Sequence, residues 1–159
     1  MKSPAVVRIA TPADEDAVYR LLLGLERDNG IGFRHDEDRV RGSIREGTER
    51  RGGIVAVIDA PDQPGEIAGS IGVHWGQFWY SHQHYLAETW LFVAPQYRRG
   101  TGYADALMQY ASWIKATFNK EGAPELPFFT AVTTRKRLAA KRRWWCRRGE
   151  EVGAIFLLR

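Results

Sequence analysis

The chain has 159 residues, the length of one ordinary domain, and its single cysteine, Cys146, excludes an internal disulfide. Its mean hydropathy is −0.39, and no stretch approaches the roughly 20 apolar residues of a membrane span, which argues against a membrane protein. The formal net charge is +4, the pI is about 9.4, and the first residues lack the apolar run of a signal peptide, so we expect a cytoplasmic protein.

The first half of the chain predicts a strand, two helices and a hairpin. In Thr11-Pro12-Ala13-Asp14 a threonine cap, an early proline and an acidic residue mark a helix start. A turn over 61–65 separates two β-branched runs, which is the pattern of a hairpin. The expected elements are a strand over 6–10, helices over 11–29 and 36–49, and strands over 54–58 and 66–75.

The second half predicts a long strand over 85–93, stopped by Pro95 and a glycine loop. Apolar residues spaced three and four apart then predict a helix that begins at Ala104 and ends before Gly122. The last expected elements are a buried strand over 128–132, a basic helix over 134–148 and a strand over 152–158. Because the chain has no repeats or linkers, we expect residues 1–159 to form a single domain.

The glycine loop Gly100-Thr101-Gly102 joins a strand to a long amphipathic helix. Unpaired backbone N–H groups at the positive end of a helix bind anions, and glycines let the backbone approach a phosphate closely. By itself the pattern also fits a tight turn. A Rossmann dinucleotide site is excluded because its fingerprint needs three glycines in an early βαβ unit, whereas this loop follows a hairpin.

The segment from Leu91 to Ala104 resembles the central motif of the GNAT acetyltransferases. Its strand ends in Val93-Ala94-Pro95, Tyr97-Arg98 follows, and Arg99 to Ala104 matches R-x-x-G-x-A at every specified position. The spacing from Pro95 to Arg99 is slightly longer than usual. The order of elements also resembles the whole GNAT fold, which implies an α/β fold with a mixed, mostly antiparallel sheet flanked by helices.

The resemblance implies transfer of an acetyl group from acetyl-CoA to a primary amine. The strand residues Leu91, Phe92 and Val93 would pair with the pantetheine arm. The loop would bind the pyrophosphate through Arg98, Arg99, Gly100, Thr101, Gly102, Tyr103 and Ala104. The acceptor is a small-molecule or peptide amine that the sequence does not identify. The oligomeric state is also open, a homodimer included.

Glu88 is the candidate general base, because acyl transfer requires that the amine lose a proton. Strand alternation predicts Leu86, Glu88, Trp90 and Phe92 on one face, where desolvation would raise the pKa of the carboxyl. The resemblance agrees, since several family members place a glutamate base on this strand. The alternative is a structural carboxylate, tied to an arginine or at the edge of the sheet.

His82 and His84 are the next candidates for a base, although both are interpreted as loop residues without a zinc-ligand partner, so no metal site is expected. The family's usual general acid is a tyrosine, and the matching position here holds Trp145, whose indole donates a hydrogen bond but no proton. Tyr103 and Tyr110 are alternatives. Cys146 is expected to be a small buried hydrophobe.

Two further segments carry open alternatives. The aromatic stretch from Trp75 to His82, with Phe33, predicts either an acceptor pocket or hairpin packing. The stretch from Arg135 to Arg148 has eight Lys or Arg and no acidic residue, which fits a solvated helix face or a phosphate-binding surface. The alternative function is therefore a catalytically weak CoA-binding module or a basic nucleic acid-binding module on the same fold.

Overall fold

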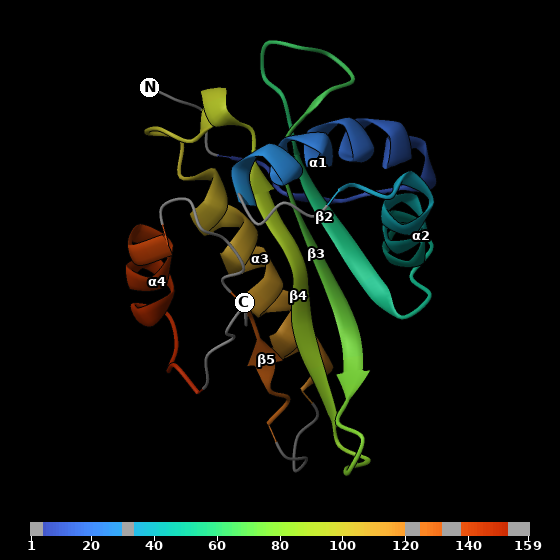
Figure 1. The fold of residues 1–159 in the computed structure, drawn as a ribbon, viewed down its shortest axis with the longest axis vertical. Coiled ribbons are helices and arrows are strands. Elements are labelled where there is room, and N and C mark those ends of the chain that lie inside the picture. Colours follow the sequence, from blue (N-terminus) through green and yellow to red (C-terminus); the bar gives the residue numbers. More distant parts are fainter. Residues whose placement is uncertain (1–4, 30–33, 120–124, 132–137, 153–159) are drawn as a thin grey trace.

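The computed structural model describes residues 5–29, 34–119, 125–131 and 138–152, which form one sheet with helices on both faces (Figure 1). The strands are β1 (Arg8–Ile9), β2 (Gly53–Asp59), β3 (Ile67–Gln77), β4 (His84–Val93) and β5 (Phe128–Phe129), and they lie in chain order. Neighbours from β1 to β4 are antiparallel, and β5 is parallel to β4. This confirms the mixed, mostly antiparallel sheet.

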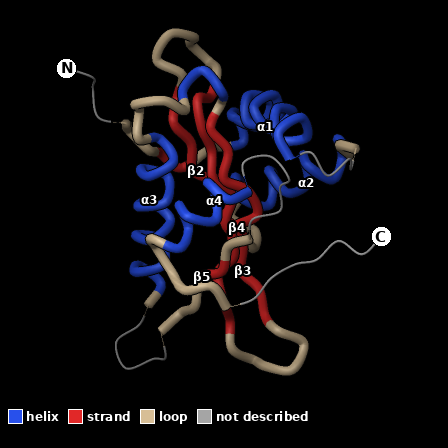
Figure 2. Tube along the Cα trace, turned by 60° about the vertical axis from the view of Figure 1, so that its left-hand side comes forward, coloured by secondary structure: helices blue, strands red, loops and turns tan. Residues whose placement is uncertain are grey.

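The helices lie in two layers (Figures 1 and 2). On one face lie α1 (Glu15–Asn29), where Gly24 packs against the Phe92 ring, and α2 (Glu37–Thr48), where Gly47 packs against Val55. On the other face lies α3 (Tyr103–Phe118), whose Leu107 packs against Gly69. The shorter α4 (Leu138–Cys146) lies beside α3, and none of the described helices is long and apolar enough to span a membrane.

The predicted helix start at Thr11 is confirmed, although the first turn is a 3-10 helix, η1 (Pro12–Asp14). The Asp14 carboxylate accepts from the Thr11 N–H at 2.8 Å, and the Arg8 guanidinium binds Asp14 at 2.8 Å and Asp59 at 2.6 Å. Arg8 lowers the pKa of Asp14 to about 2. One arginine therefore joins β1, the start of the first helix and the end of β2.

A β-bulge in β4 corrects the predicted alternation. Val73 pairs with Glu88 and Gly72 pairs with Trp90, so Thr89 is an extra residue without an opposite partner. An extra residue reverses the faces of everything beyond it. Leu86 and Glu88 therefore point to the α3 face, whereas Trp90 and Phe92 point to the face covered by α1 and α2. The prediction that all four share one face is wrong.

The other differences are at the C-terminal end. The strand expected over 128–132 is two residues long as described, and its phenylalanines are half-buried. The basic helix is confirmed from Leu138, while residues 132–137 and the strand expected over 152–158, except Val152, lie outside the described residues. Cys146 is exposed, contrary to prediction, because α4 is a short surface helix without a single buried residue.

Candidate active site

The strands β4 and β5 part soon after they meet. Their pairing joins Leu86 to Phe128 and Ala87 to Phe129, and no described strand covers the same edge of β4 from Glu88 to Val93. An uncovered strand edge offers backbone N–H and C=O groups to an extended ligand. Leu91, Phe92 and Val93 lie on this edge, as the pairing with a pantetheine arm would require.

The glycine loop follows this edge. After β4 and the short 3-10 helix η2 (Pro95–Tyr97), Gly100 and Gly102 adopt left-handed conformations with φ of 67° and 70°. The Thr101 hydroxyl donates to the Tyr97 carbonyl at 2.5 Å and accepts from the Tyr103 N–H at 3.3 Å, which fixes the turn. The carbonyl of Gly102 accepts the first bond of α3, from Ala106 at 2.9 Å.

The loop leaves room for a ligand. A Cβ atom built on Gly102 would have no heavy atom within 4 Å, so the space above this glycine is open. The N–H groups of the first helical turn lack partners within a helix, and the helix dipole makes this end positive. The arrangement fits an anionic group such as a pyrophosphate.

Arg98 fastens the loop to the rest of the protein. Its Nε donates to the Val93 carbonyl at 2.7 Å, its guanidinium pairs with Asp28 of α1 at 2.6 Å, and it lies 5.0 Å from the centre of the Phe92 ring. The side chain is thus held against β4 and α1. A role of Arg98 in cofactor binding stays a prediction. Such a role would depend on the Arg98 backbone and on the loop shape that its side chain maintains.

We expect Arg98→Ala to lower the free energy of unfolding by about 1–3 kcal/mol, because it removes charge-assisted hydrogen bonds from a half-buried site. Denaturant unfolding measures the change. Arg99→Ala is the matched control, since Arg99 is exposed and should change stability by less than about 0.5 kcal/mol. Equal effects in the two variants would contradict the structural role of Arg98.

Glu88 lies where β4 and β5 part. Its carboxylate accepts a hydrogen bond from the hydroxyl of Thr130, the residue after β5, so the contact spans the two strands at the start of their separation. Desolvation raises the pKa of Glu88 to about 7, although the Thr130 hydrogen bond and the charge of Lys141 on α4 act in the opposite direction. A carboxyl that titrates near neutrality suits general-base catalysis.

The helix α4 is attached at the first turn of α3. Asp105 accepts a hydrogen bond from the Trp144 indole at 3.2 Å and forms an ion pair with Arg148, whose guanidinium stacks 3.8 Å from the Trp144 ring centre. These contacts bring α4 beside the glycine loop. Trp145 is half-buried next to Trp144. Whether Trp145, Tyr103 or Tyr110 assists the leaving group stays open.

The aromatic segment forms the tip of the β3–β4 hairpin. Trp79 is 95% exposed, and Phe78 packs against Tyr80, Tyr85 and Phe129 with ring centres 4.8–5.7 Å apart. These contacts favour the hairpin-packing alternative for the tip. His84 is exposed four residues before Glu88, roughly 13 Å along the strand. Phe33 lies outside the described residues, within which no cluster of metal ligands occurs.

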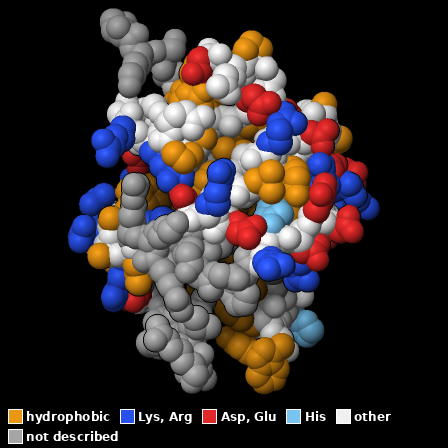
Figure 3. Space-filling view, turned by 45° about the horizontal axis from the view of Figure 1, so that its top comes forward, with side chains coloured by type: hydrophobic (Ala, Val, Ile, Leu, Met, Phe, Trp, Pro, Cys, Tyr) orange, Lys and Arg blue, Asp and Glu red, His pale blue; other side chains and the backbone are white. Residues whose placement is uncertain are grey.

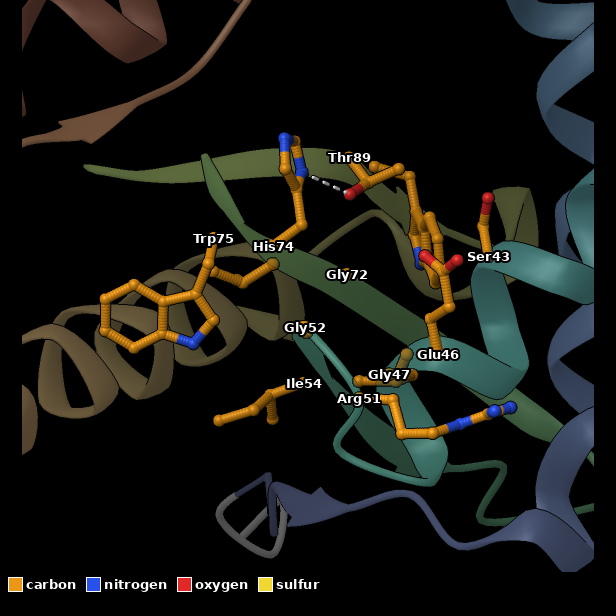
Figure 4. Close-up of a pocket in the computed structure, with 14 residues that line it drawn as sticks. Ser43, Glu46, Gly47, Arg51, Gly52, Ile54, Gly72, His74, Trp75 and Thr89 are labelled. Atoms are coloured by element: carbon orange, nitrogen blue, oxygen red, sulfur yellow. Dashed lines mark hydrogen bonds between the residues drawn. The ribbon is translucent and has the colours of Figure 1, made fainter. Parts of the chain in front are cut away.

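A pocket of about 310 Å³ lies on the face of the sheet that α1 and α2 cover (Figure 4). Its polar lining includes Ser43 and Glu46 from α2, His74 from β3 and Thr89 from β4. Of the residues that line this pocket, the sequence had indicated only Trp75 as a candidate site residue. These residues are far apart in the chain, and no local pattern predicted that the pairing of β3 with β4 would bring His74 and Thr89 together.

The fold agrees with the comparisons. The chain belongs to the acetyltransferase (GNAT) family, whose model matches residues 17–151. It is therefore a transferase of a family that uses acyl-CoA, which confirms the resemblance inferred from the loop. No curated protein matches the sequence.

Solved structures share the fold at low sequence identity. An acetyltransferase described as possible, from Clostridium difficile 630, has a TM-score of 0.69 and 16% identity over 99% of this chain and 97% of its own. Ribosomal-protein-alanine N-acetyltransferase from Brucella melitensis biovar Abortus 2308 has a TM-score of 0.66 and 11% identity, covering 99% of both chains. AAC(6')-Iy, in complex with the bisubstrate analogue CoA-S-monomethyl-acetylneamine, has a TM-score of 0.68 and 13% identity over 99% of this chain and 98% of its own.

Proposed function

We propose that this protein transfers an acetyl group from acetyl-CoA to a primary amine, with Glu88 as the general base. The observation that carries the proposal is the position of Glu88. A carboxyl with a pKa of about 7 lies at one end of the strand edge that no described strand covers, and the glycine loop lies at the other. The CoA complex of AAC(6')-Iy, a protein of the same fold, supports the choice of donor.

Each part of the edge has a role in this proposal. The backbone of Leu91, Phe92 and Val93 would pair with the pantetheine arm, and the N–H groups from Arg99 to Ala104 would hold the pyrophosphate. Acetyl-CoA supplies the activated acyl group. Glu88, in its ionised form, removes a proton from the acceptor ammonium directly or through water, so that the neutral amine attacks. The indole of Trp145 can donate a hydrogen bond but not a proton.

We expect millimolar acetyl-CoA to raise the melting temperature, because a ligand that binds only the folded state stabilises it by mass action. Thiol release, measured with a panel of amines, amino acids, aminoglycosides and peptides, then tests turnover and ranks the acceptors. A reaction without any acceptor controls for hydrolysis of the thioester. The proposal fails if acetyl-CoA neither shifts the melting temperature nor releases thiol with any acceptor.

The nucleic acid-binding alternative rests on the basic helix. Arg142 on this helix pairs with Glu151 at 2.8 Å, and Arg148, two residues beyond the end of the helix, pairs with Asp105. Contacts of this kind reduce the charge that α4 offers to phosphates. We therefore put forward no nucleic acid-binding function, and salt-dependent retention on RNA or DNA would be the observation that revives it.

A further inference from the structure

The pocket on the α1/α2 face reaches the strand that carries the candidate base. It extends from the end of α2 across β2 and β3 to Thr89 and Trp90 on β4 (Figure 4). Thr89 directly follows Glu88, and the ordinary alternation of a strand directs the two side chains to opposite faces of the sheet. A molecule in this pocket would thus approach the edge of β4 from the face opposite to α3 and α4.

The β4 end of the pocket offers hydrogen-bonding groups from two side chains. The Nδ1 atom of His74 lies 2.9 Å from the Thr89 hydroxyl, and both side chains are exposed (Figure 4). A hydroxyl both donates and accepts, and a neutral imidazole offers one donor and one acceptor. This end can therefore orient an amine that has lost its proton.

The α2 end offers a negative charge. Acidic and basic side chains gather on the side of the molecule that carries α1 and α2 (Figure 3), where Arg41 and Arg45 pair with Glu15. Arg51, which lines the pocket, pairs with Glu49. Among the described residues Glu46 has no ion-pair partner. The arginines near the pocket therefore do not neutralise the charge of the Glu46 carboxylate.

Between these ends the floor is apolar. The buried ring of Trp90 covers Gly72, its indole donates to Ser70 at 3.1 Å, and Val55 contributes a further aliphatic surface. A Cβ at residue 72 would lie 2.8 Å from the Trp90 ring, so glycine is required beneath the indole. Because the indole N–H is already bonded, the floor suits a hydrocarbon chain.

Resting on the proposed function, we infer that this pocket binds the acetyl acceptor, and that the acceptor is an aliphatic diamine. One amine lies beside His74 and Thr89, on the face of β4 opposite to the Glu88 side chain. It receives the acetyl group at the edge of β4, and its proton passes to Glu88 through water. The second, as an ammonium, binds Glu46. The chain between the two nitrogens crosses the apolar floor from α2 to β4. An acceptor with a carboxylate at its far end would be repelled by Glu46.

Three acceptors of equal length test the inference: an α,ω-diaminoalkane, the corresponding 1-aminoalkane and the ω-amino acid. We expect the highest kcat/KM for the diamine. Glu46→Gln should lower kcat/KM for the diamine roughly tenfold or more, the scale of a lost charge-assisted hydrogen bond, mainly by raising KM. The 1-aminoalkane should be unaffected, and Glu46→Lys should reverse the preference toward the ω-amino acid.

Asp38→Asn is the matched control, because Asp38 is an exposed acid on the same helix that does not line the pocket. Calorimetry of the diamine with the wild type and Glu46→Gln gives a second readout that needs no turnover, and binding should weaken by the same factor. If amines are acetylated but Glu46→Gln changes the diamine and the 1-aminoalkane equally, the pocket assignment is wrong and the acetyltransferase function stands. If no amine releases thiol and calorimetry detects no diamine binding, both fail.

Discussion

Replacing Glu88 by Gln should lower the rate of acetyl transfer at neutral pH by roughly 10²-fold or more, while the affinity for acetyl-CoA should stay nearly unchanged. Glutamine keeps the size of the side chain but cannot accept the proton of the amine. Because the pKa of Glu88 is about 7, the wild-type rate should rise between pH 6 and 8 and then level off, and this rise should vanish in the variant. Steady-state thiol release across this pH range measures both effects.

The same substitution has a predictable effect on stability. Burial raises the pKa of Glu88 above its usual 4.5, so its favourable contribution is fully present below pH 4.5 and is lost as the pH rises through 7. Glu88→Gln should therefore gain stability relative to the wild type from pH 5 to 8. Glu125→Gln, an exposed carboxylate paired with Lys115, is the control for both measurements. Full activity in Glu88→Gln would place the base elsewhere, and lost acetyl-CoA binding would make Glu88 structural.

Replacing Gly102 by Glu should abolish the stabilisation that millimolar acetyl-CoA gives. The new carboxylate would occupy the open space above the loop, where it would repel the phosphates that the positive end of α3 attracts. Thermal unfolding with and without acetyl-CoA measures the loss.

A matched control separates this repulsion from backbone strain. Gly65, in the turn between β2 and β3, has φ of 81° and likewise no atom within 4 Å of a Cβ, so Gly65→Glu has comparable strain at a distant site. The Gly65→Glu variant should keep the full rise in melting temperature that acetyl-CoA gives. A shift that survives in Gly102→Glu would show that the loop does not hold the pyrophosphate.

The sequence predicted features that depend on neighbours along the chain. The cap at Thr11, the hairpin turn before Ile67 and the left-handed glycines 100 and 102 each follow from a few consecutive residues. The position of Glu88 on the strand that leads into the glycine loop followed from strand order. These features need no knowledge of how distant strands pair.

What the sequence missed depends on pairing between strands. The residues from Leu86 to Phe92 keep a regular alternation, and only their register with β3 shows that Thr89 is extra. The pocket joins Ser43, His74 and Thr89 from three separate elements, so no single segment predicts it. The exposure of Cys146 likewise depends on where α4 packs.

The alternation of side chains along β4 also bears on how such a protein can diversify. Glu88 and Thr89 are consecutive residues and therefore face opposite sides of the sheet, so the proposed base and the proposed acceptor pocket are separated by the thickness of a backbone. A substitution on α2 or β2 can alter the pocket without disturbing the desolvated surroundings that tune Glu88. In the proposed assignment, selectivity for new acceptors can therefore evolve stepwise while the chemistry of acyl transfer is inherited unchanged.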